Sequence, residues 1–125
     1  MTLNQAIECI DRIRPNKYTA AQKLAWLSAL DGRLFNEVIL THEGTEEAAP
    51  FSPYTEETAG DTPLLVPAPY DEGVYTHYLE ARVAQANGEA AKYNQAAALY
   101  NSACSDWLRR YNRCVMPIGG ERFRW

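Results

Sequence analysis

Residues 71–114 read DEGVYTHYLEARVAQANGEAAKYNQAAALYNSACSDWLRRYNRC, and this stretch decides the fold. On both sides of Asn87-Gly88, apolar residues recur three and four positions apart, which is the spacing of a helix face. Gly88 suits the left-handed conformation in which many helices end. The pattern therefore predicts one helix that begins with Asp71 as its N-cap and stops at Asn87-Gly88, and a second helix over 89–114. Because so few residues separate them, we expect the two helices to be antiparallel neighbours.

Large and small side chains alternate along one face of the 89–114 segment at a near-heptad spacing. The members of this seam are Tyr93, Ala97, Tyr100, Cys104, Trp107 and Tyr111. Such a face is typical of a helix that packs against a facing helix. We expect Cys104 to act there as a small buried hydrophobic residue.

Two further helices are predicted upstream, over 2–13 and 19–40. Each begins with a threonine followed three residues later by a glutamine, the pattern of a capping box (Thr2 and Thr19). Pro15 ends the first helix, because the residue before a proline disfavours helical geometry. Asp31-Gly32 interrupts the second pattern, so it is either one helix, bent at this point, or a helix that breaks at Gly32 and is followed by a shorter one.

The segment 41–69 has a different composition. It contains five of the seven prolines, and between His42 and Asp61 there are six acidic residues and neither lysine nor arginine. A connection of this length is usually functional or disordered. We expect an extended loop that is either a solvated linker or an arm that docks on a neighbouring subunit. The candidate anchors of such an arm are Phe51, Tyr54, Leu64, Leu65 and Val66.

The C-terminal end is basic, with five arginines and one acidic residue between Trp107 and Trp125. Cations near a helix C-terminus complement the helix dipole, which is one interpretation. Arginine and aromatic residues also dominate protein interfaces, and arginine binds nucleic-acid phosphates. The candidate interface residues of this end, which includes the tail 115–125, are Arg109, Arg110, Arg113, Arg122, Phe123, Arg124 and Trp125. If the acidic arm of one copy meets the basic end of the next, the contact is heterologous and can close into a ring.

The whole-chain composition fits a single folded domain, 1–125. Of its 125 residues 46% are hydrophobic and 22% are charged, which is ordinary for a globular protein. A net charge of −4 disfavours a general nucleic-acid coat protein. No run approaches the roughly 20 apolar residues of a membrane span, and we expect no signal peptide and no membrane partner. The predicted fold class is all-α, a small antiparallel bundle of about four helices with a long proline-rich acidic loop between the second and third.

Catalytic signatures are missing from the sequence. It has no nucleophile elbow, phosphate-binding loop or zinc-protease motif. His77 and Glu80 are spaced to interact on a helix, but a solvated histidine is the simpler interpretation. Asp11 and Asp31 are interpreted as parts of solvated helix faces. We expect neither an enzyme nor a cofactor or metal site. The cysteines are odd in number and none lies in a CxxC pair, so we expect Cys9, Cys104 and Cys114 to stay reduced.

Several runs resemble small proteins encoded in the head and connector gene clusters of tailed phages and prophages. The resemblance extends over nearly the whole chain except its extreme C-terminus, and these runs carry it. The runs are PNKY (15–18), KLAWLSALDGR (23–33), NEVI (36–39), LLVPAPYD (64–71), YLEA (78–81), NGE (87–89) and KYN (92–94).

The resemblance implies a head-tail connector, also called an adaptor or head-completion protein. Such proteins are helical, form a homo-oligomeric ring and join the portal to other connector or tail proteins. It implies a structural role in the virion, with assembly in the host cytoplasm and no catalytic residues. The alternative is a nucleic-acid-binding accessory protein of phage DNA packaging that uses Arg109, Arg110, Arg113, Arg122 and Arg124.

Overall fold

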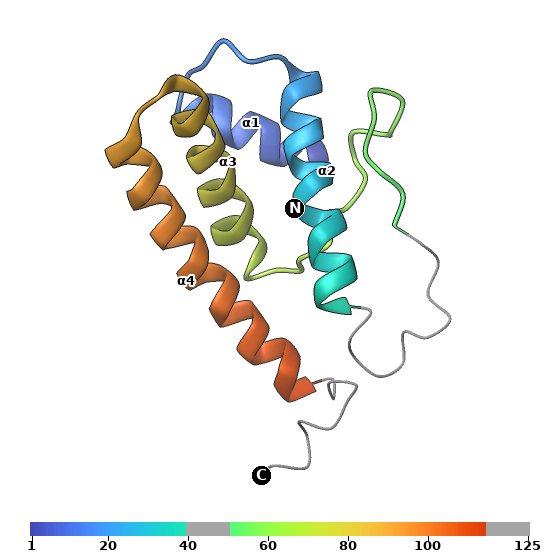
Figure 1. Cartoon of the computed structure of the whole chain (residues 1–125). Coiled ribbons are helices and arrows are strands. Elements are labelled where there is room, and N and C mark those ends of the chain that lie inside the picture. The colour runs from blue at the N-terminus through green and yellow to red at the C-terminus, as the bar shows by residue number, and fades with distance from the viewer. Residues whose placement is uncertain (40–50, 115–125) are drawn as a thin grey trace.

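The structure, a computed structural model, describes residues 1–39 and 51–114, and this part of the chain is built from four helices (Figure 1). They are α1 (Leu3–Ile13), α2 (Ala20–Glu37), α3 (Asp71–Asn87) and α4 (Ala90–Cys114). Within the described ranges the only β-type pairing is an isolated bridge between Thr2 and Pro63. The predicted all-α class and the four helices are confirmed.

The predicted helix signals were correct at three ends. Thr2 and Thr19 both form complete capping boxes, with Gln5 and Gln22 as the reciprocal partners. Gly88 ends α3 in the left-handed region with φ 75°. These local interactions fix where α1, α2 and α3 begin or end before any tertiary contact is counted.

One local prediction was wrong. Asp71 is the first residue of α3 and not its N-cap, and its carboxylate binds the Met1 amino group at 2.6 Å. Of the two alternatives at Gly32, the single helix is confirmed, because α2 continues through Gly32 to Glu37. A ring carbon of Phe51 lies 3.4 Å from the place that a Gly32 Cβ would take, so an aromatic ring occupies the space beside this glycine.

Helix α3 lies at the centre of the described structure. It packs against all three others, whereas the backbone of α4 lies close to α3 alone among the described helices. Its buried face includes Val74, Tyr75, Leu79 and Val83, each at most 1% exposed. Those side chains meet the apolar faces of α1 and α2 on one flank and Trp107 of α4 on the other. Burial of this central helix is the main apolar contribution to folding.

The predicted seam of α4 is only partly confirmed. Trp107 is buried, and Tyr100, Cys104 and Tyr111 are partly buried against the core. Tyr93, at the start of the helix, is 36% exposed. This end stays open because the backbone of α4 lies close to α3 alone among the described helices.

Residues 51–66, which we call the strap, lie against the helices. Near its end the strap runs beside the start of α1, where the Leu3 amide donates to the Thr62 carbonyl and the Leu64 amide to the Met1 carbonyl, at 3.1 and 2.9 Å. Helices long and apolar enough to cross a membrane do not occur in the described ranges.

Replacing Trp107 with alanine tests how α4 is held. Because Trp107 and Ala96 are the buried residues of α4, we expect Trp107→Ala to lower the free energy of unfolding by about 3–5 kcal/mol. Urea unfolding followed by circular dichroism measures it. The control is Leu99→Ala on the same helix, where the side chain is 46% exposed and the change should stay within about 0.5 kcal/mol. Equal losses in the two variants would contradict the packing described.

Candidate interaction surface

A buried carboxylate, Asp31, ties the strap to the helices. Asp31 lies on α2 and is 0% exposed. Its Oδ1 accepts a hydrogen bond from the Tyr75 hydroxyl at 2.6 Å, and its Oδ2 accepts from the Tyr54 hydroxyl at 2.6 Å and the Leu65 amide at 3.1 Å. The Val66 amide in turn donates to the Tyr75 hydroxyl at 2.8 Å. One carboxylate therefore joins α2, α3 and the strap.

The interpretation of Asp31 as part of a solvated helix face was wrong. Burial raises its pKa, although hydrogen bonds from Tyr54, Tyr75 and Leu65 act in the opposite direction. Burial and the nearby Asp31 carboxylate also raise the pKa values of both tyrosines, so they stay protonated hydrogen-bond donors. The site is built to hold the strap, and its chemistry is structural.

The candidate anchors of the predicted arm are bound within the same chain. The Phe51 ring packs against two other aromatic rings. Its centroid lies 6.2 Å from that of Phe35 on α2 and 5.3 Å from that of Tyr54. Leu64 and Val66 are 6% and 0% exposed in the core, and Leu65 is partly buried. Leu64 and Val66 are covered by the chain's own helices, which corrects the expectation that these two residues reach a neighbouring subunit. For the half-buried Phe51, Tyr54 and Leu65 it stays a prediction. The first part of the predicted loop, residues 40–50, lies outside the described residues.

The arginines of the basic end differ in their surroundings. Arg109 forms an ion pair with Asp106, one turn earlier on α4. Arg110 is exposed and lines a hollow, and Arg113 is exposed in the last turn. Arg122, Phe123, Arg124 and Trp125 lie outside the described residues.

The hollow at this end is mainly apolar, with a volume of about 570 Å³, and we call it the Trp107 hollow. It lies between the segment that leads into α3 and the last turns of α4. Its lining residues are Pro67, Ala68, Pro69, Tyr70, Trp107, Arg110 and Tyr111. Aromatic and proline surfaces with one arginine at the edge are typical of a site that receives an apolar side chain of a protein partner. The sequence analysis predicted the arginine but missed Pro67–Tyr70, which is far from α4 in the sequence.

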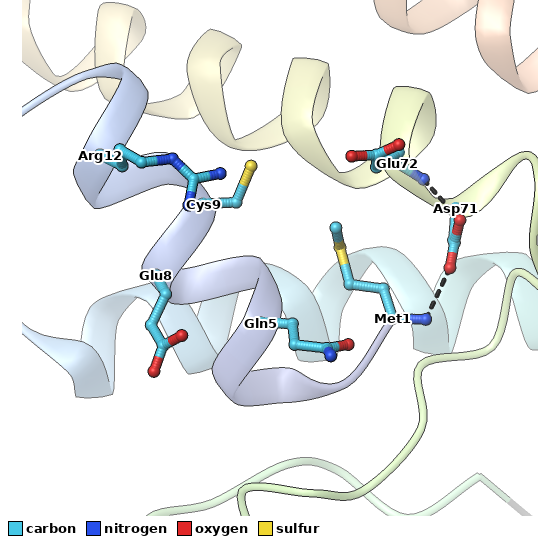
Figure 2. Close-up of a pocket in the computed structure, with 7 residues that line it drawn as sticks. All are labelled: Met1, Gln5, Glu8, Cys9, Arg12, Asp71 and Glu72. Atoms are coloured by element: carbon cyan, nitrogen blue, oxygen red, sulfur yellow. Dashed lines mark hydrogen bonds and ion pairs between the residues drawn. The ribbon is translucent and has the colours of Figure 1, made fainter.

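A second hollow, of about 410 Å³, lies where α1 meets the start of α3 (Figure 2). In this hollow Asp71 accepts from the Met1 amino group at 2.6 Å and from the Glu72 amide at 2.8 Å. Cys9 is buried and lies 3.6 Å from the Thr76 hydroxyl. Figure 2 shows Glu8 and Arg12 pointing along the outside of α1. The arrangement fastens the start of the chain to α3.

Groups suited to catalysis or metal binding are scattered over the described structure. His77 and Glu80 do interact, with Nδ1 and Oε1 3.2 Å apart, as neighbours one turn apart on α3. Burial raises the pKa of the Cys104 thiol, which disfavours a reactive thiolate. In residues 1–39 and 51–114, groups of three or more histidine, cysteine, aspartate or glutamate side chains that could hold a metal ion do not occur.

Comparison with known proteins adds no relative. No family model matches the chain, and neither a curated protein nor a solved structure matches it. The functional argument therefore depends on the surfaces described above and on the resemblance seen in the sequence.

Asp31→Ala tests the buried carboxylate. It leaves two hydroxyls and one amide without their acceptor, so we expect the free energy of unfolding to fall by about 3 kcal/mol or more. Urea unfolding measures the loss. Glu56→Ala, an exposed change in the strap, is the control and should change stability by less than about 0.5 kcal/mol.

The pH dependence gives a second test of the same group. Burial raises the pKa of Asp31 in the folded chain above 3.8, its ordinary value, so the folded state binds the proton more tightly than the unfolded state does. The free energy of unfolding therefore falls as the pH rises from 3.8 through the raised pKa. Asp31→Asn removes that titration. As the pH rises through this window, we expect the free energy of unfolding of the natural chain to fall relative to that of Asp31→Asn. Urea unfolding at a series of pH values measures both. A difference independent of pH would contradict the assignment.

Proposed function

We propose that this chain is a structural subunit of the head-tail connector of a tailed phage or prophage. In this role it joins the portal to other connector or tail proteins as part of a homo-oligomeric ring, with assembly in the host cytoplasm and a final place in the virion. The sequence runs that resemble proteins of head and connector gene clusters suggest this role. The helical architecture is compatible with it.

The observation that carries the proposal is the Trp107 hollow. Since the predicted arm anchors are bound within the chain, this hollow is where an exposed arginine and an apolar surface still lie together. Arg110 at its edge can form hydrogen bonds with a carboxylate or a backbone carbonyl of the partner while the apolar lining receives a side chain. We therefore assign the portal contact to this hollow.

The DNA-binding alternative has weaker support. Of the three arginines in the described part of the basic end, Arg109 is already paired with Asp106. A net charge of −4 also opposes a phosphate-binding role. DNA binding is accordingly an outcome that the following experiment is designed to detect.

Capture by the portal tests the proposal. The tagged portal encoded in the same gene cluster is immobilised, and binding of the full chain is measured by biolayer interferometry. We expect Arg110→Glu to weaken binding at least tenfold because it reverses the charge at the edge of the hollow. Lys17→Glu, an equal charge change in the exposed α1–α2 connection, should bind like the natural chain.

Two results would count against this function. If Arg110→Glu binds the portal as tightly as the natural chain does, the Trp107 hollow is not part of the portal contact. No binding of the natural chain to the portal, together with salt-sensitive retention on DNA, favours the packaging alternative.

A further inference from the structure

A separate groove lies between α2 and α4, with α3 as its floor. Its volume is about 260 Å³. Each of the three helices contributes polar side chains to it. They include Arg33 of α2, Tyr78, Arg82 and Gln85 of α3, and Tyr100 and Asn101 of α4. None of the described residues that line the groove is acidic.

Two arginines in this groove lack a carboxylate partner in the described structure. Arg33 is exposed and donates to the Tyr100 hydroxyl at 3.0 Å. Arg82 lies over the Trp26 ring, 5.7 Å from its centroid, and donates to the Gln85 amide oxygen at 3.2 Å. Among the described residues the buried Nε of Arg82 has no hydrogen-bond acceptor. An unsatisfied buried donor costs free energy, so the hydrogen-bonding capacity of Arg82 is not fully used within the described structure.

The guanidinium groups of Arg33 and Arg82 both lie near the Tyr78 hydroxyl. Burial raises the pKa of Tyr78, while the charges of Arg82 and Arg33 act to lower it. Both arginines line the groove beside Tyr78, Arg33 from α2 and Arg82 from α3, the helix that also carries Tyr78. Two arginines that converge beside hydroxyl and amide donors form a binding geometry for a carboxylate.

We propose that this groove binds the acidic turn of a second copy of the chain, which carries Glu56, Glu57 and Asp61. The contact rests on the proposed function and supplies one subunit interface of the ring. All three acidic side chains are exposed, and none of them forms an ion pair with a described residue. The charges of the two surfaces are complementary, which favours one orientation of the two copies.

The placement of the two surfaces favours contact between copies over contact within one. The strap and its acidic turn lie on one side of α2, while α4 lies on the other (Figure 1). The strap is held there by Asp31 and by Ser28, whose hydroxyl accepts from the Tyr54 amide at 3.1 Å. Complementary patches on opposite sides of one molecule give a head-to-tail contact, which repeats from copy to copy and closes when the rotation permits.

Sedimentation velocity of the full chain at low salt, without portal, tests the contact with two neutral double variants. Arg33→Gln with Arg82→Gln disables the groove, and Glu56→Gln with Glu57→Gln disables the turn. The natural chain should associate increasingly with concentration, whereas each double variant alone should show an association constant at least tenfold lower. An equimolar mixture of the two variants should form dimers and stop there, because each dimer retains one intact pair of surfaces.

Controls separate lost charge and lost folding from a lost contact. Arg12→Gln with Lys17→Gln removes two exposed positive charges elsewhere and should associate like the natural chain. If the groove double variant is unfolded by circular dichroism, Arg33→Gln alone, an exposed change, should still weaken association.

Three outcomes would overturn the proposal: a natural chain that stays monomeric at every concentration, double variants that associate like it, or a mixture that stays monomeric. Portal binding without self-association would reject this contact and leave the proposed function standing. Self-association through the groove without portal binding would support this contact and count against the portal-binding role.

Discussion

The structure depends on one buried carboxylate. Asp31 accepts hydrogen bonds from Tyr75 on α3 and from Tyr54 and Leu65 on the strap, and all of these donors need an acceptor once water is excluded. Without it, the strap would have to place polar backbone against apolar helices. With it, Leu64 and Val66 enter the core beside α3. The fold thus turns a proline-rich connection into a structural part of the helical body.

This use of the strap determines which surfaces remain for partners. Two of its apolar anchors, Leu64 and Val66, are buried, and its acidic turn faces solvent. The backbone of α4 lies close to α3 alone among the described helices. Helix α4 therefore presents the Trp107 hollow at its C-terminal end and one wall of the arginine groove nearer its start. Two separate surfaces suit a subunit that must contact both a different protein and copies of itself, as the proposed connector role requires.

The sequence was a good guide to most local signals, although Asp71 is not the N-cap of α3. The capping boxes of Thr2 and Thr19 and the left-handed Gly88 depend on residues a few positions apart, and they were predicted correctly. The burial of Asp31 could not be predicted, because its donors lie 23 to 44 residues away and an aspartate on a helix is usually solvated. The sites followed the same rule. Arg110 was found from composition, whereas the Trp107 hollow and the pairing of Arg33 with Arg82 arise only when distant helices meet.

Amide hydrogen exchange, read residue by residue by NMR, tests the central role of Asp31 most directly. The account predicts that the Leu65 and Val66 amides of the natural chain exchange almost as slowly as the amides in the middle of α3, because both are bonded at the buried carboxylate or its tyrosine partner. In Asp31→Asn the strap amides should exchange much faster, while those of α3 and α4 keep most of their protection. Rapid exchange of Leu65 and Val66 in the natural chain, or equal protection in the variant, would contradict it.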